Sequence, residues 1–314
     1  MKKAKVKMKG RVGDNIVKAI IFTVLAIYAL SMIVLLVWGF MTSLKNYRDF
    51  SLFRNVVGLP SLEHSKDEIL FGNYIYVLKN FNIKKTEYFF FGSRLISHET
   101  ESGILKMLLN TFIYAGVGSL LSTICSCTVG FLCAKYKFKF SKMVYTFALF
   151  MMIIPVVGSY PSMISMLRGF GIYDTYFTHI IQKFTFGGMY YFVFLAFFEG
   201  MSDAYFEAAE IDGASQFRIY LSIVLPLAIK IITSVTLINF VSYWNDYTTS
   251  LLYTPTIPTL ATGVYYLCYE GRGLFVKVPV QCAACMILAI PILILFIFLN
   301  KRLMGNISMG GVKE

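Results

Sequence analysis

Four acidic residues lie close together in an otherwise apolar part of this 314-residue chain. They are Asp203, Glu207, Glu210 and Asp212, and the run around them reads EAAEIDGAS, residues 207–215. The small side chains of this run let another backbone approach closely, and the carboxylates can pair with Lys or Arg of such a partner. The grouping therefore predicts a surface that binds a basic, closely packed protein.

The residues around these acids predict two short helices joined by a tight corner. Residues 207–210 favour a helix, and Gly213 suits the left-handed position that ends one. Ala214-Ser215 can open a second helix, which Pro226 ends or kinks. An amphipathic connector lying on the membrane is the alternative, but surface-binding helices prefer Lys and Arg, and this segment is acidic.

A second polar group lies in the apolar stretch that follows. At about 100° per residue, one face of a helix there carries Thr236, Asn239, Ser242, Tyr243 and Asp246. Amide, hydroxyl and carboxylate groups beside aromatic rings suit a sugar, whose hydroxyls need hydrogen bonds and whose C–H faces stack on rings. The same groups could instead hydrogen bond to neighbouring helices and hold them together. Asp246 is costly within a membrane unless it faces a cavity or a partner.

Motifs for catalysis, metal binding and nucleotide binding are missing from the sequence. No G-x-x-x-x-G-K-[ST] phosphate loop and no H-E-x-x-H pattern occurs, and His64, His98 and His179 are scattered. Cys282 and Cys285 form a C-x-x-C pair without a second pair or a nearby His, so zinc is not expected. The sequence predicts a protein without a cofactor that is not an enzyme, whose energy comes from another polypeptide.

The composition places the chain in a membrane. Hydrophobic residues make up 57% of it and charged residues only 15%. The net charge of +12 comes from basic residues that cluster at the ends of apolar stretches. This distribution indicates membrane topology and lipid contact and not nucleic-acid binding.

Six membrane spans are predicted, which makes the chain an all-α polytopic membrane protein. Each of four charge-free stretches can cross a hydrocarbon core, which needs roughly 20 apolar residues. They are residues 19–44, 107–134, 143–167 and 278–300. Two further spans are less clean: 184–198 is short, and 231–252 contains Asp246. The fourth span is expected to continue upstream through FTHIIQ, with the Lys183 stem carrying its ammonium to the headgroups.

Basic residues then orient the chain. Residues 1–18 are rich in Lys and form a cytoplasmic N-terminus, followed by the first span, 19–44, as a retained anchor. Residues 45–106 form an extracytoplasmic loop, whose mixed charge and aromatic clusters suggest partly ordered structure. Residues 107–300 form a core of five spans that includes a cytoplasmic loop at 200–230, and 301–314 form a cytoplasmic C-terminus.

The acidic run carries a family resemblance. E-A-A-x-x-D-G-A followed by I-x-L-P-L, residues 207–214 and 223–227, resembles the "EAA loop" of membrane permease subunits of bacterial ABC importers. Further matches are typical of the sugar-importer permeases of the maltose type, specifically the subunit with six spans; they are Asn73-Tyr74, Asn110-Thr111 and Trp244-Asn245-Asp246. The similarity covers most of the chain, but residues 81–106 are longer than expected for that subunit.

The resemblance implies the type I ABC importer permease fold, in the bacterial cytoplasmic membrane. It also implies partners: a second homologous permease, an ABC ATPase dimer at the cytoplasmic face, an extracytoplasmic solute-binding protein and a carbohydrate substrate of the oligosaccharide class. In this family the EAA loop is a coupling helix that sits in a cleft of the ATPase and converts its closure into rocking of the spans.

The resemblance assigns roles to particular residues. The ATPase-coupling residues are Glu207, Ala208, Ala209, Asp212, Gly213 and Ala214. Glu207 is expected to contact a basic residue of the ATPase, and Gly213 to keep the corner tight. The residues expected to line the substrate pathway are Asn239, Ser242, Tyr243 and Asp246.

Three alternatives stay open. The same type of importer could carry another solute, such as glycerol phosphate or a peptide, although an anionic solute calls for basic residues in the pathway and the predicted spans contain none. A stand-alone secondary transporter predicts inverted repeats and several buried titratable groups, and among these only Asp246 qualifies. A membrane sensor would need an output domain, which is missing.

Overall fold

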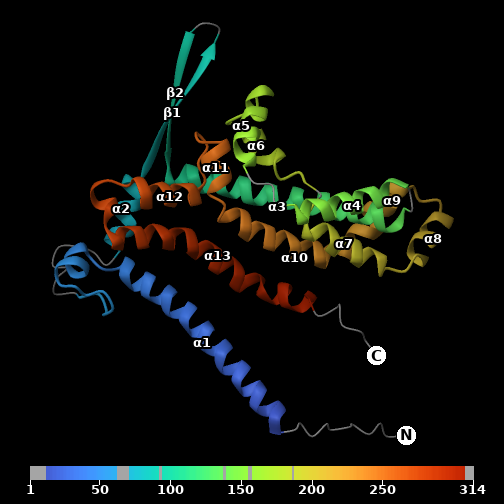
Figure 1. Cartoon of the computed structure of the whole chain (residues 1–314), viewed down its shortest axis with the longest axis horizontal. Helices are drawn as coiled ribbons and strands as arrows, with labels where there is room; N and C mark the ends of the chain where they lie inside the picture. Colours follow the sequence, from blue (N-terminus) through green and yellow to red (C-terminus); the bar gives the residue numbers. More distant parts are fainter. Residues whose placement is uncertain are drawn as a thin grey trace. The chain divides into compact units, whose positions relative to one another are not determined.

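The structure is a computed structural model that describes residues 12–61, 71–91, 94–136, 139–154, 158–185 and 187–307. Most of these residues are helical (Figure 1). Part of the predicted basic N-terminus, residues 1–11, and part of the predicted C-terminus, residues 308–314, lie outside the described residues. The chain divides into two compact units, Met1–Val77 with Arg272–Met286 and Leu78–Gly271 with Ile287–Glu314.

The first unit is built around a long apolar helix, α1 (Val12–Ser43), whose apolar side chains are exposed on all sides. A helix that is apolar all round belongs in lipid or in a core. After it come a π-helical turn (Arg48–Leu52) and the start of α2 (Gly72–Asn80). A short 3-10 helix (Gly273–Val276) and the first part of α13 (Val278–Ile307) complete the unit.

Lys45 follows α1 and is buried in this unit. Its Nζ donates hydrogen bonds to the carbonyl oxygens of Asn55 at 2.7 Å and Val56 at 3.1 Å. Burial lowers the pKa of Lys45, while the negative charge of Asp49 acts to raise it. Asn73, one of the motif residues, donates to the carbonyl oxygens of Ser43 and Lys45 and so ties α2 to the end of α1.

Four helices in the described part of the chain are long and apolar enough to cross a membrane. They are Asn15–Ser43, Ile104–Lys135, Gln216–Trp244 and Val278–Phe298, and they correspond to the first, second, fifth and sixth predicted spans. Two shorter apolar helices, Phe140–Ile153 and Met189–Glu199, lie where the third and fourth spans were predicted. The chain is therefore a helical multi-pass membrane protein, as its composition predicts.

Two predicted spans are not continuous helices. The third comprises α4 (Lys139–Ile153) and α5 (Ser159–Gly169), and Gly158, directly before α5, adopts the left-handed φ of 77°. The fifth ends earlier than predicted, since α10 (Leu225–Trp244) stops before Asp246 and a separate short helix, α11 (Thr248–Tyr253), follows. The prediction of one helix through residue 252 is wrong.

The second unit is organised by α3 (Ile104–Lys135), which packs along α10 and along α7 (Met189–Glu199) (Figure 1). Gly130 permits the contact with α7, because a Cβ there would lie 2.9 Å from the Cβ of Phe194 and 3.1 Å from the backbone nitrogen of Leu195. Close backbone approach at small residues is a usual way for membrane helices to pack. The apolar core between these helices includes Phe131, Phe194, Phe198, Val224 and Val235.

An antiparallel hairpin precedes α3. Strand β1 (Asn82–Phe91) pairs with β2 (Arg94–Gly103) in a register that runs from Asn82 opposite Gly103 to Phe91 opposite Arg94. Together with α2 it lies in the predicted outer loop, where partly ordered structure was expected. The strands were not predicted. Figure 1 shows the hairpin extending from the N-terminal end of α3.

The N-terminal part of α3 also holds the connection between α11 and α12 (Leu260–Glu270). Asn110 Nδ2 donates to the carbonyl oxygen of Pro258 at 2.9 Å, and Thr111 Oγ1 accepts from the backbone N–H of Leu260 at 2.7 Å. These two motif residues are buried and thus have a structural role. Trp244 is buried as well and donates to the carbonyl oxygen of Leu288.

Candidate functional site

The acidic run folds as the predicted corner. Helix α8 (Ala204–Ile211) ends at Asp212, and Gly213 has a φ of 78°. The backbone N–H of Ala214 donates to the carbonyl of Ala209, and that of Gly213 donates to the carbonyl of Glu210. This pair of bonds is the Schellman motif, which needs a left-handed residue where Gly213 stands. The second helix, α9 (Gln216–Ile219), starts at Ser215, whose side chain accepts from the N–H of Arg218.

Side chains on both sides fix this corner to α3. At the end of α3, Lys135 Nζ lies 2.7 Å from Asp203 Oδ1 and 2.5 Å from the carbonyl oxygen of Met201. Across the corner, Gln216 Nε2 donates to Glu210 Oε1 at 2.6 Å, and the Tyr136 hydroxyl donates to Gln216 Oε1. Two of the four acids therefore have partners within the chain.

The charge of Glu210 also acts on Tyr136. Burial, followed by the negative charge of Glu210, raises the pKa of the Tyr136 hydroxyl above its usual value. The hydroxyl therefore keeps its proton at neutral pH and remains a donor to Gln216. This contact keeps the corner in place through a residue that directly follows α3.

The six predicted coupling residues divide into an exposed and a packed set. Glu207, Ala208, Asp212 and Gly213 are exposed, whereas Ala209 is buried and Ala214 is partly buried against the apolar core. Within the described residues, Glu207 and Asp212 make no ion pair and no side-chain hydrogen bond. Two large apolar side chains stand exposed beside them, Ile211 at 86% and Phe217 at 70%.

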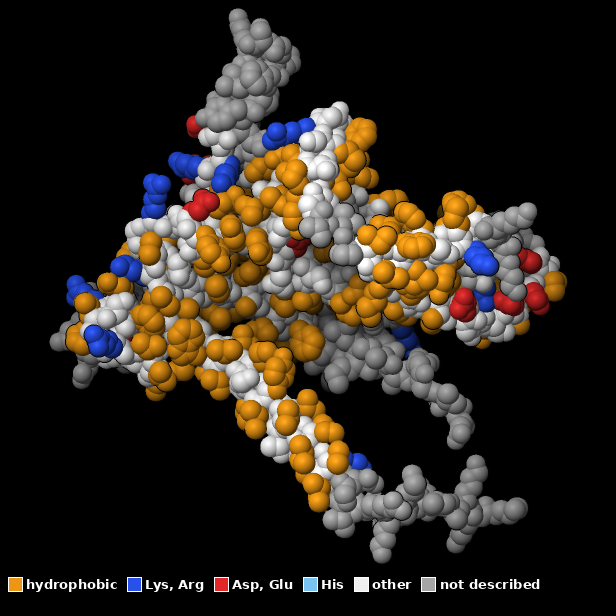
Figure 2. Space-filling view, in the orientation of Figure 1, with side chains coloured by type: hydrophobic (Ala, Val, Ile, Leu, Met, Phe, Trp, Pro, Cys, Tyr) orange, Lys and Arg blue, Asp and Glu red, His pale blue; other side chains and the backbone are white. Residues whose placement is uncertain are grey.

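Figure 2 shows acidic side chains gathered around α8 and α9, next to helices covered by hydrophobic side chains. Glu207 and Asp212, which have no partner within the described residues, lie beside the exposed side chains of Ile211 and Phe217. Such a surface suits a basic protein with an apolar pocket. Depletion of charge at the centre and charge at the rim are typical of such interfaces. The corner therefore presents both carboxylates and apolar side chains to its surroundings.

Beyond α9 the chain enters α10 through one π-helical turn (Tyr220–Val224). Pro226 lies in the first turn of α10, where its missing N–H leaves no bond broken. The Tyr220 hydroxyl and Thr128 Oγ1 are 2.6 Å apart, which joins this turn to α3. The helix therefore does not end at Pro226: it continues from Gln216 to Trp244, with the π turn directly before the α10 segment.

The four residues predicted to line a pathway have different surroundings. Asn239 is buried, and its Nδ2 donates to Thr123 Oγ1 of α3 at 3.1 Å, so it joins two helices. Ser242 is exposed and bonds to the carbonyl of Ile238 in its own helix. Tyr243 and Asp246 are partly exposed and lie in one polar cluster with residues of α3.

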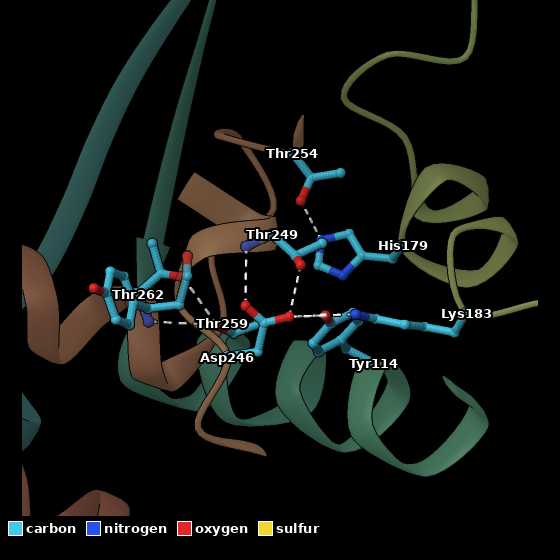
Figure 3. A network of polar contacts seen from close by, with 9 residues as sticks. Tyr114, His179, Lys183, Asp246, Thr249, Thr254, Thr259 and Thr262 are labelled. Carbon is cyan, nitrogen blue, oxygen red and sulfur yellow. Dashed lines mark hydrogen bonds and ion pairs between the residues drawn. The ribbon is translucent and has the colours of Figure 1, made fainter. Parts of the chain in front are cut away.

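Asp246 is the centre of this cluster (Figure 3). Its Oδ2 accepts hydrogen bonds from the Tyr114 hydroxyl at 2.5 Å and from Thr249 Oγ1 at 2.6 Å, and its Oδ1 accepts from the backbone N–H of Thr249 at 3.0 Å. The carboxylate thus caps the start of α11 and connects it to α3. These three hydrogen bonds offset the cost of an ionised group in an apolar segment.

The surroundings of Lys183 differ from the predicted ones. It was expected to extend to the headgroups from a continuous helix, but α6 (Tyr176–Ile181) ends before it and α7 begins after it. Its Nζ lies 3.3 Å from Asp246 Oδ2, and its side chain is only 13% exposed. The ammonium also lies 4.4 Å from the ring centre of Tyr243 and 5.0 Å from that of Tyr114.

This position changes the charge of the predicted pathway. An anionic solute was disfavoured because the predicted spans contain no basic residue. Lys183 reaches the stripe from a connecting segment, so a cation does lie beside Tyr243 and Asp246. The one sign of this contact in the sequence was Asp246 itself, because an acid in an apolar stretch needs a cavity or a partner.

His179 and Thr254 extend the cluster on its α6 side (Figure 3). The His179 ring is buried, forms a hydrogen bond with Thr254 Oγ1, and meets the Tyr114 ring edge-on at 4.8 Å between centroids. Within the described residues, no group of three or more His, Cys, Asp or Glu side chains could hold a metal ion.

Comparison with known proteins identifies the class. A family model described as "Binding-protein-dependent transport system inner membrane component" matches residues 126–308, which is more than half of the chain. The chain belongs to this family. It is therefore an inner-membrane transport component and not an enzyme, and the matched range includes the acidic corner, Lys183 and Asp246.

The individual relatives named below are less than 30% identical to the chain. The chain is 28% identical over 218 residues to the maltodextrin transport system permease protein MdxG of Bacillus subtilis, covering 68% of this chain and 77% of that protein. It is 27% identical over 209 residues to the melibiose/raffinose/stachyose import permease protein MelC of the same organism, covering 65% and 75%. One chain of a bacterial ABC transporter involved in the import of the acidic polysaccharide alginate matches with a TM-score of 0.72 and 20% identity, covering 93% of this chain and 98% of that chain. This structural likeness shows the permease fold.

Proposed function

We propose that this chain is one of two permease subunits of an ATP-driven importer and that it forms half of the translocation pathway for an oligosaccharide. The observation that carries the proposal is the exposed corner at α8 and α9. It presents Glu207 and Asp212 outward while Lys135 and Gln216 attach it to the rest of the unit. A surface that is exposed, acidic and rigidly attached suits the transmission of movement from a partner.

The corner docks on a cytoplasmic ATPase in this proposal. Glu207 pairs with a basic residue of the ATPase, and Ile211 and Phe217 enter its cleft. Because Ala209 and Ile219 belong to the same apolar core as α3, α7 and α10, closure of the ATPase pair would move the helices with the corner. Hydrolysis itself belongs to the separate ATPase dimer.

A carbohydrate substrate is supported by the relatives and by the polar cluster. MdxG, MelC and the alginate transporter carry sugars according to their names. Tyr243 and Asp246 offer an aromatic face, a hydroxyl and a carboxylate, which are the groups that recognise a sugar. In this proposal Tyr243, Asp246 and the exposed Ser242 face the pathway, and Asn239 contributes by fixing α10 to α3.

The proposal also includes the remaining partners and the topology. A second permease supplies the other half of the pathway, and an extracytoplasmic solute-binding protein delivers the sugar. Six crossings in the bacterial cytoplasmic membrane, with both termini in the cytoplasm, arise if α4 with α5 and α6 with α7 each cross once. The corner then lies on the cytoplasmic side, where an ATPase can reach it.

The test is to purify the chain with its native partners in lipid nanodiscs and to measure ATP hydrolysis with each of a panel of oligosaccharides and the binding protein. One oligosaccharide class should stimulate hydrolysis, and it should do so only when the binding protein is present. A complex that contains no ATPase, or a hydrolysis rate that no sugar changes, would contradict the proposal. An ion gradient that drives uptake without ATP would point instead to a secondary transporter.

A further inference from the structure

We propose that Lys183 makes the pathway accept an acidic sugar, by binding the carboxylate of a uronic-acid unit beside Asp246. This inference rests on the proposed function and specifies the class of oligosaccharide. The observations that carry it are the contacts of the Lys183 ammonium, the close approach of its stem to Gly118, and the three hydrogen bonds that Asp246 accepts from other residues.

The hydrogen bonding of the Asp246 carboxylate depends little on Lys183. Its carboxylate has three other hydrogen bonds, two at 2.5 and 2.6 Å to Oδ2 and one at 3.0 Å to Oδ1, whereas Lys183 Nζ is farther away at 3.3 Å. All three come from Tyr114 and Thr249, which α3 and α11 hold in place (Figure 3). Because these donors stay with Asp246, Lys183 can bind a second carboxylate while Asp246 remains satisfied.

Lys183 in turn has unused hydrogen-bonding capacity. An ammonium has three N–H donors, yet within the described residues its one hydrogen-bond acceptor is Asp246. Its other neighbours are the rings of Tyr243 and Tyr114, at 4.4 and 5.0 Å from the ring centres. Aromatic faces attract a cation but do not replace strong acceptors. A carboxylate oxygen suits the remaining N–H donors of Lys183 better than a neutral hydroxyl does, because a hydrogen bond between two charged groups is shorter and stronger.

The stem of Lys183 passes close to α3 at Gly118. A Cβ at Gly118 of α3 would lie 3.1 Å from Lys183 Cγ, so the absence of a side chain at Gly118 lets the stem cross α3. The Lys183 and Asp246 side chains are 13% and 21% exposed, which keeps the charges largely out of water and leaves an edge for a ligand. In such surroundings a charge interaction is stronger than in bulk water.

The Tyr243 ring supports the assignment to a sugar. The ring lies against the ammonium and is partly exposed, so the C–H face of a pyranose could stack beside the position where its carboxylate meets Lys183. A free inorganic anion would need only the cation. A uronic-acid unit uses the cation, the ring and the hydrogen-bonding edge of Asp246 together.

The experiment compares two substrates in the complete importer. The complex and its binding protein are reconstituted in liposomes with ATP, and uptake is measured for a labelled tri-uronate and for its carboxyl-reduced neutral counterpart. Lys183→Gln should lower tri-uronate uptake by about 10- to 100-fold, the loss expected for one charge-assisted hydrogen bond. The ratio of tri-uronate uptake to neutral-sugar uptake should fall with it, because the neutral sugar has no carboxylate for Lys183 to bind. Lys183→Arg, which keeps the charge, should retain most tri-uronate uptake. Lys106→Gln, an exposed Lys of α3, is the control and should change neither.

Other outcomes would overturn the inference. An equal loss of both sugars in Lys183→Gln, with a lower melting temperature of the complex, would show that the pair with Asp246 is only structural. Unchanged uptake of both sugars, or a wild-type importer that carries the neutral sugar and rejects the tri-uronate, would also overturn it while leaving the proposed function intact. Failure of the wild-type complex to import any oligosaccharide would instead contradict the proposed function itself.

Discussion

Glu210 and Gln216 meet across the corner formed by Gly213, with Gln216 Nε2 2.6 Å from Glu210 Oε1. The bond closes the loop between α8 and α9, and Tyr136 holds Gln216 from the other side. Hydrogen bonds therefore connect the corner to the residue that follows α3. That property matters more for a coupling role than the number of acids it carries.

Replacing Gly213 with Val should uncouple transport from ATP hydrolysis. The left-handed φ of 78° costs a residue other than glycine about 1–2 kcal/mol, and a β-branched residue is among the least tolerant. Sugar uptake should fall several-fold, while the amount of chain in the membrane stays unchanged. Gly213→Asn is the matched control, because Asn tolerates this conformation. Normal uptake by the Val variant would count against the coupling role.

Reversing the charge of Glu207 should weaken the complex with the ATPase. Glu207 is exposed and has no partner in the described part of the chain, so Glu207→Lys leaves the fold intact but places a cation against a basic partner. Recovery of the ATPase with the purified permease should fall by about tenfold or more, since like charges at an interface repel and each 1.4 kcal/mol is tenfold in affinity. Glu101→Lys, an exposed acid of β2, is the control. Unchanged recovery of the ATPase with Glu207→Lys would refute the assignment.

Asn239 and Thr123 should stabilise the contact between α3 and α10 as a pair. Their hydrogen bond of 3.1 Å is buried, and bonds of this kind in membrane proteins contribute about 0.6 kcal/mol on average. A cycle of Asn239→Ala, Thr123→Ala and the double variant should show a coupling energy of that size in denaturant unfolding. Ser242→Ala, which loses a bond only within its own helix, should not couple to Thr123→Ala. Strictly additive effects of Asn239→Ala and Thr123→Ala would show that the bond contributes nothing.

A large side chain at Gly130 should separate α3 from α7. Even a Cβ would lie 2.9 Å from Phe194 Cβ and 3.1 Å from the Leu195 nitrogen, so Gly130→Leu forces the helices apart. Overpacking of this kind costs about 1–3 kcal/mol. The melting temperature of the purified chain should drop by several degrees. Gly116→Ala on the same helix, where a Cβ meets nothing within 4 Å, should leave it unchanged.

The local chemistry of the corner was predictable because its determinants are neighbours in the sequence. Gly213 ends α8 through its own backbone freedom, Ser215 caps α9 within one turn, and Pro226 directly follows the π turn in the first turn of α10. The apolar runs likewise predict which segments are long enough to cross a membrane, since length and hydropathy are local quantities. The break at Gly158 was missed because a glycine in an apolar run is compatible with either a continuous or a broken helix.

The contacts around Asp246 were decided by the tertiary structure. The sequence determined that a carboxylate in an apolar stretch needs partners, but Tyr114 and Lys183 are 132 and 63 residues away from it. Which side chains meet there depends on how α3 and the segment before α7 are rotated against the end of α10, and packing over the whole unit fixes that rotation. For the same reason Asn239 lies between two helices, although periodicity alone placed it on the same face as Asp246.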